Sequence, residues 1–312
     1  MTSETLPHQL QGHTTYLPFR SNTSSLLLNH TWSITYGDGS SASGSVYTDR
    51  VSLGFGNSSS SRAAVVVSNQ TVESARLVSP AFTYDASCSG ILGLALSGNS
   101  VKPVRARTFL ENLQEQKILP RAVFTADLQS RAPGRYSFGF IDEKAYTGEM
   151  GFVSVSPRGS PWWRFMAGGF QVGNDEQTGT GRVDMAWPAI ADTGTSLLLA
   201  PVTVVTEYYA KVNGSAFDPE WAGMVFPCGT KLPDWSFFLG EYRGTVPGRY
   251  FSYSKINETH CYGGMQSSED IGFGVFGDVV LKAQFVVFDL EEKRLGFANK
   301  VLGESVGFNG IP

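Results

Sequence analysis

Residues 190 to 199 read Ile-Ala-Asp-Thr-Gly-Thr-Ser-Leu-Leu-Leu, which places a single acid, Asp192, in a Gly-containing turn between two apolar runs. Apolar residues on both sides indicate buried backbone, where a carboxylate is costly unless hydrogen bonds compensate it. The Thr193 and Thr195 hydroxyls and the Gly194 N–H can supply such bonds, which favour the ionised form of a carboxylate. An ordinary β-turn stays open as an interpretation, because Asp and Gly are common turn residues.

The composition predicts a β-rich protein with two lobes. The chain has 312 residues with 35 Gly, 21 Phe and 12 Tyr, which indicate strands, turns and bulges rather than helices. Its apolar runs are all shorter than the ~20 residues of a membrane span. The net charge of −4 is spread along the chain without blocks. We therefore expect neither a membrane nor a nucleic acid as a partner.

The cysteines and glycosylation sequons favour a secreted protein. Residues 1–8 contradict this, because they are polar and lack the charged and apolar regions of a signal peptide, so two alternatives stay open: a cytosolic protein, or a natural beginning other than Met1. Cys228 and Cys261 flank residues 229–260 and could close that segment as a disulfide, leaving Cys88 unpaired as a core thiol. Metal binding is the weaker interpretation, because no Cys-x-x-Cys or His-x-x-x-His spacing supplies further ligands. We expect no metal and no other cofactor. Sequons for N-glycosylation occur at Asn22, Asn29, Asn57, Asn69, Asn213 and Asn257.

A β-hairpin is predicted early in the chain. Residues 31–36 alternate as a strand, residues 37–40 (Gly-Asp-Gly-Ser) form a turn, and residues 44–51 return as a second strand. Tyr36 lies at the tip of this hairpin. Two interpretations stay open for it: a cross-strand packing residue, or part of a mobile hairpin that folds over a ligand and approaches it closely through its glycines.

A Gly-apolar pattern occurs twice in the chain. Residues 90–96 read Gly-Ile-Leu-Gly-Leu-Ala-Leu, which predicts a buried strand crossed closely by another backbone. Residues 274–281, Gly-Val-Phe-Gly-Asp-Val-Val-Leu, look like a second copy of that strand, and Asp278 within it is interpreted as structural. A repeat of this kind implies two related lobes, with the cleft between them as the natural site. We place the lobes at 1–141 and 142–312, on either side of a charged loop.

Other elements are expected between these landmarks. A short helix is predicted over 108–116 with Thr108 as its cap, and another around Glu207 to Tyr209. Strands are predicted over 63–67, 123–128, 135–140, 285–289 and 295–298.

In this order the features resemble a pepsin-type aspartic endopeptidase, and most of all the secreted fungal branch of that family. The motif around Tyr36 resembles the flap, residues 90–96 the N-lobe apolar-apolar-Gly strand, residues 191–196 the C-lobe catalytic loop, and residues 275–281 its partner strand. Cys228 and Cys261 match the C-lobe disulfide of the family. The resemblance implies an all-β, bilobal acid protease fold, with two related β-barrel lobes and a cleft between them.

The resemblance also implies a mechanism and the residues that perform it. In that family two aspartates, one from each lobe, share a proton and activate a water, and because two such carboxylates cannot both ionise easily the pair works best in acid. Asp192 would be one of the two. Gly194, Thr195 and Ser196 would support that carboxylate or the substrate backbone. Tyr36 would close over the substrate, and Gly37 and Asp38 would bind its main chain.

One departure from the family pattern is large. A first Asp-Thr-Gly should precede the flap, yet the chain has no aspartate before Asp38. Residues 3–15 resemble the loop that follows the first catalytic motif, so we expect an incomplete N-terminal lobe whose aspartate is encoded upstream of Met1. Loss of buried strands costs ~2–5 kcal/mol per large side chain against a total stability of ~5–15 kcal/mol. The 312-residue chain alone is therefore expected to be inactive or poorly folded.

Three functions follow from the sequence. The leading one is an acid endopeptidase that cleaves peptides or proteins beside apolar side chains and acts as a monomer. The second is a pseudoprotease that binds peptides or a protein partner in the cleft without cleaving them. A dimer with one aspartate per chain, as in retroviral proteases, is disfavoured by the two lobe signatures in one chain.

Overall fold

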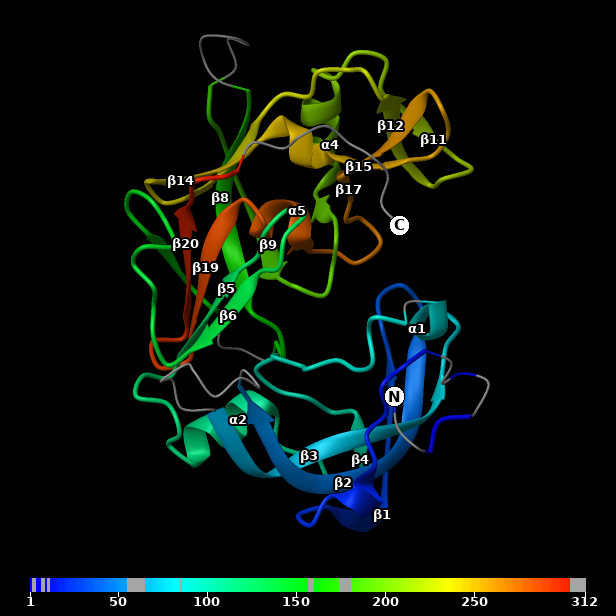
Figure 1. The fold of residues 1–312 in the computed structure, drawn as a ribbon. Helices are drawn as coiled ribbons and strands as arrows, with labels where there is room; N and C mark the ends of the chain where they lie inside the picture. Colours follow the sequence, from blue (N-terminus) through cyan, green and yellow to red (C-terminus); the bar gives the residue numbers. More distant parts are fainter. Residues whose placement is uncertain are drawn as a thin grey trace. The chain divides into compact units, whose positions relative to one another are not determined.

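The computed structural model describes residues 1, 4–6, 9, 12–54, 65–84, 86–156, 160–173 and 181–303. The chain divides into two compact units, Met1–Pro120 and Arg121–Pro312, both built mainly from strands (Figure 1). The predicted lobe boundary after residue 141 differs from this division in the placement of residues 121–141, and it stays a prediction. The sequon at Asn57 and the first two residues of the strand expected over 63–67 lie outside the described residues.

The described residues of the first unit form an antiparallel sheet with the strand order β3-β2-β1-β4. Its strands are β1 (Ser25–Thr35), β2 (Ser41–Leu53), β3 (Val65–Val78) and β4 (Val101–Lys102). Two short helices, α1 (Ala81–Tyr84) and α2 (Phe109–Glu115), and a 3-10 turn, η2 (Pro18–Arg20), accompany the sheet. The core of this unit lies against the sheet, where Trp32, Val46, Ala75 and Val101 are buried together.

The predicted hairpin is confirmed as β1 and β2. Thr35 pairs with Ser41 at its end, and the turn is closed by a bond of 2.8 Å from Tyr36 N–H to the Ser40 carbonyl. Gly39 has a φ of 80°, a left-handed conformation that glycine adopts without strain. The turn chemistry and the alternating strands therefore agree, which is why this element was predictable.

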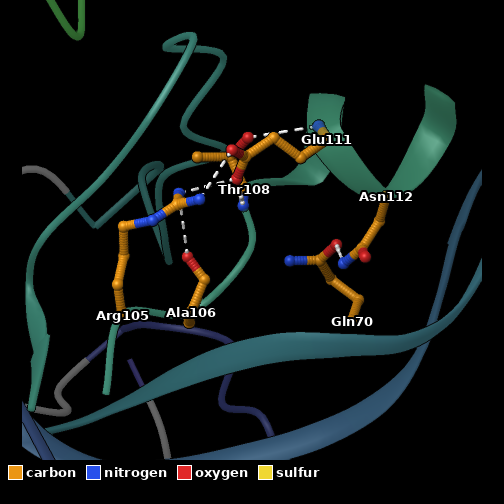
Figure 2. Close-up of polar contacts among 6 residues, drawn as sticks. All are labelled: Gln70, Arg105, Ala106, Thr108, Glu111 and Asn112. Carbon is orange, nitrogen blue, oxygen red and sulfur yellow. Dashed lines mark hydrogen bonds and ion pairs between the residues drawn. The ribbon is translucent and has the colours of Figure 1, made fainter. Parts of the chain in front are cut away.

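The helix predicted over 108–116 is confirmed as α2, and Figure 2 shows its capping box. Thr108 Oγ1 accepts a bond from Glu111 N–H at 3.2 Å, while the Glu111 carboxylate accepts one from Thr108 N–H at 2.7 Å. Arg105 adds a two-pronged ion pair to Glu111, with both distances 2.9 Å. Asn112 donates to Gln70 of β3 at 2.9 Å and so ties the helix to the sheet.

The strand predicted over residues 90–96 is wrong. The described residues 86–100 contain no strand, and the side chains of Ile91 and Leu92 are 60% and 43% exposed. An added Cβ at Gly90 or Gly93 would meet nothing within 4 Å, so no backbone of the described residues crosses closely here. A strand needs partners for its peptide groups and its apolar face. Cys88, expected in the core, is exposed beside this segment.

The described residues of the second unit form three sheets. A seven-stranded sheet has the order β14-β13-β8-β9-β18-β10-β17, a five-stranded sheet the order β6-β5-β19-β20-β7, and a four-stranded sheet the order β11-β12-β16-β15. The strands are β5 (Val123–Asp127), β6 (Arg135–Phe138), β7 (Gly151–Ser154), β8 (Arg164–Val172), β9 (Val183–Ala191), β10 (Leu198–Ala200), β11 (Ala216–Asp218), β12 (Gly223–Pro227), β13 (Trp235–Leu239), β14 (Tyr242–Val246), β15 (Ser252–Lys255), β16 (His260–Gly263), β17 (Met265–Ser267), β18 (Gly274–Phe276), β19 (Gln284–Asp289) and β20 (Arg294–Asn299).

The described residues of the second unit also contain two helices and a 3-10 turn: α4 (Val202–Tyr209), α5 (Asp278–Leu281) and η3 (Gly248–Phe251). The four strands predicted between residues 123 and 298 are confirmed as β5, β6, β19 and β20. Helix α4 begins five residues earlier than the predicted helix. The strand predicted over 274–281 is right only as far as Phe276, because the chain then turns at Gly277 into α5.

An aromatic cluster fills the core of the second unit. The ring of Phe276, which is fully buried, lies between Phe165 and Phe237 with centroid distances of 5.1 and 5.0 Å. Trp235 and Phe297 lie slightly farther away, at 6.1 and 6.4 Å. Such edge-to-face contacts add to the stabilisation from buried apolar area. Strand β18, which carries Phe276, is therefore held at the centre of the unit.

The all-β class is confirmed, with one difference in form. All four sheets of the described residues are open, so the lobes are not the closed barrels that we expected. The predicted disulfide is present between Cys228 and Cys261, with 5.0 Å between their Cα atoms, and it joins the end of β12 to β16. Among the helices of the described residues, none is long and apolar enough to cross a membrane.

Candidate active site

The Asp-Thr-Gly turn follows directly on strand β9. That strand ends at Ala191, and the N–H of Asp192 donates to the Phe276 carbonyl of β18 at 3.1 Å. The chain returns into the sheet as β10, with the Leu198 N–H bonded to the Gly264 carbonyl at 2.9 Å. Asp192 itself is partly buried. The apolar runs on both sides therefore anchor the turn in the sheet and leave the acid near the surface.

The Asp192 carboxylate is held by two donors from its own turn. Gly194 N–H donates to Oδ1 at 2.9 Å, and the Thr195 hydroxyl donates to Oδ2 at 2.7 Å. A Cβ at position 194 would lie 3.2 Å from Oδ1, so glycine leaves the space that this carboxylate oxygen occupies. Both oxygens thus have fixed partners, as the Asp-Thr-Gly-Thr sequence predicted.

A second segment, the start of α5, holds the turn through two backbone hydrogen bonds. Asp278 N–H donates to the Thr195 carbonyl at 2.8 Å, and Val279 N–H donates to the Ser196 carbonyl at 3.0 Å. Gly277 makes this approach possible, because an added Cβ would lie 2.3 Å from the carbonyl oxygens of both Thr195 and Leu197. The repeat pattern in the sequence predicted this close crossing, and at Gly277 it is found.

Three side chains near Asp192 were not predicted as parts of the site. Asp278, the first residue of α5, pairs with Lys282 at 2.9 Å, and the pKa of its carboxyl is raised, chiefly by burial. Tyr136 of β6 shares a hydrogen bond with Thr193, and burial together with the nearby Asp278 and Asp192 charges raises the pKa of its phenol. Tyr136 lies more than fifty residues from the turn, and no local pattern marks it.

The hairpin residues predicted to bind substrate lie in the first unit. Tyr36 is partly buried, and its ring makes an edge-to-face contact with Phe82 of α1 at 5.5 Å. The Asp38 carboxylate accepts bonds from the Ser40 hydroxyl at 2.6 Å and from the Ser40 N–H at 2.9 Å, and these bonds lower its pKa. Gly37 is exposed, with open space around it. The turn is therefore ordered by its own side chains.

The structure divides the predicted residues between the two units. Tyr36, Gly37 and Asp38 lie in Met1–Pro120, whereas Asp192, Gly194, Thr195, Ser196 and the disulfide lie in Arg121–Pro312. Within the described ranges, no cluster of three His, Cys, Asp or Glu residues could hold a metal ion.

The Asp-Thr-Gly turn lies between two strands of a mainly β unit, as is typical of the pepsin-like acid proteases. These features place the chain in that fold class. The structure is similar to the crystal structure of an aspartic proteinase from Irpex lacteus, with a TM-score of 0.73, 20% identity, and coverage of 92% of this chain and 85% of that one. At this level of identity the likeness shows the fold.

Sequence comparison shows the family. The profile of the eukaryotic aspartyl protease family matches residues 2–300. The chain is 45% identical to endothiapepsin of Cryphonectria parasitica over 96% of its own length and 68% of that protein. It is 41% identical to aspergillopepsin-1 of Aspergillus oryzae and 42% identical to penicillopepsin-3 of Penicillium janthinellum, in each case over 95% of this chain and 71% of the relative. The chain therefore belongs to the eukaryotic aspartyl proteases.

Proposed function

We propose that Asp192 is one of the two catalytic carboxylates of an acid endopeptidase. The observation that carries this proposal is the geometry of its turn: both carboxylate oxygens have fixed donors, and β18 and α5 hold the turn from below. A carboxylate fixed in this way can take a proton from a water that attacks a peptide carbonyl. Family membership supports the same assignment.

The reaction needs a second carboxyl group in the opposite protonation state. One carboxylate acts as base on the water, while the other, protonated, polarises the carbonyl and supplies a proton. Asp-Thr-Gly occurs once in the 312 residues, at 192–194. We propose accordingly that this polypeptide by itself does not hydrolyse peptides, and that activity returns when a second Asp-Thr-Gly is supplied.

The proposed substrates are extended peptides with apolar side chains beside the cleaved bond. Tyr36, Gly37, Asp38 and Ser196 are assigned to substrate binding. The support for the hairpin residues is local: Gly37 is exposed with open space around it, and the Asp38 turn is ordered by Ser40. Exposed backbone of this kind can pair with the main chain of an extended peptide.

The test supplies the second carboxylate from a relative. A segment carrying the first Asp-Thr-Gly of a fungal family member is fused in front of Met1, and cleavage of a denatured protein is measured between about pH 3 and pH 7. We expect acid-dependent, pepstatin-sensitive cleavage, reduced by at least ~10³-fold in the Asp192→Asn variant. The Asp184→Asn variant is the control, because Asp184 forms an exposed ion pair with Arg182.

Two outcomes would contradict the proposal. If the Asp192→Asn fusion keeps its pepstatin-sensitive activity, Asp192 is not catalytic. If the unfused 312-residue chain cleaves in a pepstatin-sensitive way, its second carboxylate comes from a residue other than an Asp-Thr-Gly aspartate.

The single Asp-Thr-Gly also favours a second candidate, a chain that binds peptides without cleaving them. Calorimetry with pepstatin and the unfused chain separates the two cases. Micromolar binding without cleavage supports a peptide-binding pseudoprotease, and absence of binding rejects it. We further propose that the protein is extracellular, because it has a disulfide and exposed sequons such as Asn213 and Asn257. We also propose that it is a monomer, because two lobe signatures occur in one chain. Sedimentation and fractionation of the culture medium test this.

A further inference from the structure

One sequon of the second unit is exposed along its whole length. Asn257, Glu258 and Thr259 lie in the turn between β15 and β16, and all three residues are exposed. In each of the other described sequons, at least one of the three residues is partly or wholly buried. An enzyme that attaches an N-linked glycan recognises the asparagine together with the hydroxyl two residues later. Among the described sequons, the one at Asn257 is therefore the most accessible to such an enzyme.

The two polar atoms of the Asn257 side chain have different surroundings. Its Oδ1 accepts bonds from the Thr259 N–H at 2.9 Å, the Thr259 hydroxyl at 3.0 Å and the His260 N–H at 2.8 Å. Its Nδ2 has no hydrogen-bond partner among the described residues. The amide nitrogen is the atom to which an N-linked glycan is attached. The oxygen thus orders the turn, and the nitrogen stays free for modification.

Attachment of a glycan to Asn257 preserves the bonds that order the turn. In the transfer, the bond from sugar C1 to the diphosphate of a polyprenyl-diphosphate-linked oligosaccharide breaks, and a bond from C1 to Nδ2 forms. Nδ2 loses one proton, and the polyprenyl diphosphate leaves. The product is still an amide whose Oδ1 has both lone pairs, so it accepts the same three bonds. The turn can carry the sugar without rearranging.

Two other sequons use their hydroxyl groups elsewhere in the fold. Ser215, the third residue of the Asn213 sequon, donates to the Tyr209 carbonyl at 2.8 Å. Ser24, the third residue of the first sequon, accepts a bond from a tyrosine hydroxyl at 3.2 Å. The Thr259 hydroxyl instead bonds within its own exposed turn. The geometry therefore separates the sequon at Asn257 from these two.

The Asn257 turn is also fixed to its surroundings. The Thr259 carbonyl accepts a bond from the Cys228 N–H at 2.9 Å, and Cys228 forms the disulfide with Cys261 of β16. On the other side of the turn, the Ile256 N–H donates to the His260 carbonyl at 3.0 Å. The exposed amide is thus presented by an ordered hairpin that the disulfide joins to β12.

We propose that Asn257 is an N-glycosylation site that carries an oligosaccharide in the folded protein. The proposal rests on the extracellular location proposed above, because N-linked glycans belong to the surface loops of secreted proteins. It does not involve Asp192 or the second catalytic carboxylate. The ligand class is an oligosaccharide supplied on a polyprenyl diphosphate, and the modified atom is Asn257 Nδ2.

The test maps the glycan in the full 312-residue chain, expressed in yeast behind a cleavable secretion signal and collected from both cells and medium. A peptide N-glycosidase in water enriched in heavy oxygen converts each glycosylated asparagine into a labelled aspartate, which mass spectrometry locates. We expect the label at Asn257 in most molecules. It should be lost in Thr259→Ala, which lacks the hydroxyl, and kept in the matched variant Thr259→Ser.

Two results of this mapping overturn the proposal: an unlabelled Asn257 in the wild type, or the same labelling in Thr259→Ala. Because the supplied signal brings the chain to the glycosylating enzyme, either result counts against the site and not against the proposed location. Fractionation of the culture medium for the natural protein tests the location separately.

A second measurement asks whether the glycosylated turn keeps its fold. Asn257→Asp has the same acceptor oxygen and no glycan, whereas Asn257→Ala has neither. We expect the amides of Thr259 and His260 to exchange with deuterium equally slowly in the glycosylated chain and in Asn257→Asp, and at least about tenfold faster in Asn257→Ala. Faster exchange in the glycosylated chain than in Asn257→Asp, or equal exchange in all three, contradicts the proposal.

Discussion

Residues 90–96 and 274–281 share one sequence pattern and have different structures. In both, two glycines enclose a pair of large apolar residues, Ile91 and Leu92 in the first and Val275 and Phe276 in the second. The first pair is exposed and forms no strand, whereas the second pair is buried in β18. The same local pattern therefore specifies a strand only where the rest of the fold supplies its neighbours.

The neighbours of β18 are visible in its hydrogen bonds. It pairs in parallel with β9, Val275 opposite Ile190, and antiparallel with β10, Phe276 opposite Leu198. In the first unit, the described sheet instead ends with the short strand β4 beside β1. A strand with both edges paired satisfies its peptide groups, and burial of its side chains adds ~1.5–3 kcal/mol each.

The largest expected difference concerns the aromatic residue of β18. Phe276→Ala removes a ring packed against Phe165 and Phe237, which should lower the free energy of unfolding of the second unit by ~3–5 kcal/mol. The matched variant Leu92→Ala, at the corresponding position of the first copy, should cost less than ~1 kcal/mol because Leu92 is 43% exposed. Urea unfolding measures both. Similar losses in the two variants would show that residues 90–96 are packed in solution.

Substitution of the second glycine in each copy gives another pair of variants with opposite expectations. The difference in their stability should be smaller than for the first pair. Gly277→Ala forces a Cβ to within 2.3 Å of two carbonyl oxygens, which should cost ~1–3 kcal/mol. Gly93→Ala meets nothing within 4 Å and should be neutral within ~0.5 kcal/mol. Thermal unfolding followed by circular dichroism compares them. A neutral Gly277→Ala would mean that the Asp192 turn does not rest on α5 as described.

The smallest effect concerns a partly buried acid of the first unit. Glu73 of β3 accepts a bond from the Ser100 hydroxyl at 2.6 Å, and burial raises the pKa of its carboxyl. A raised pKa stabilises the fold in acid, and this contribution is lost as the pH rises through the folded pKa. Glu73→Gln should therefore unfold like the wild type in acid and be more stable at neutral pH by roughly 1 kcal/mol or less.

Urea midpoints at pH 4 and pH 7 measure this difference. If Glu73→Gln is less stable than the wild type at both pH values, the Ser100 bond outweighs the cost of burial. Ser100 lies in the chain between residues 90–96 and β4. The result therefore also tests how the segment that follows the first Gly-apolar copy is held to the sheet.

The sequence predicted those elements whose partners are close in the chain or whose turn chemistry is explicit. The β1–β2 hairpin has its Gly-Asp-Gly-Ser turn, α2 has its Thr108 cap, and the Asp192 turn has donors two and three residues away. Family resemblance supported the disulfide, which the positions of Cys228 and Cys261 already allowed, and supplied the catalytic assignment of Asp192, which stays a prediction. These features depend on local residues or on an ordered set of motifs.

The sequence did not predict features that depend on distant residues. Leu92 and Phe276 sit in the same pattern, and only long-range pairing separates an exposed side chain from a buried one. Tyr136 of β6 contacts Thr193, and Asp278 at the start of α5 lies against the turn that follows β9. The change from strand to helix after Phe276 was missed because Val279, Val280 and Leu281 suit a strand equally well.

Hydrogen–deuterium exchange tests the central claim most directly, because it reports both copies in one sample of the wild-type chain. We predict that the amides of Val275 and Phe276 exchange at least about a hundredfold more slowly than those of Ile91 and Leu92. Comparable protection of the two pairs would contradict the claim that β9 and β10, rather than the Gly-apolar pattern itself, make the second copy a strand.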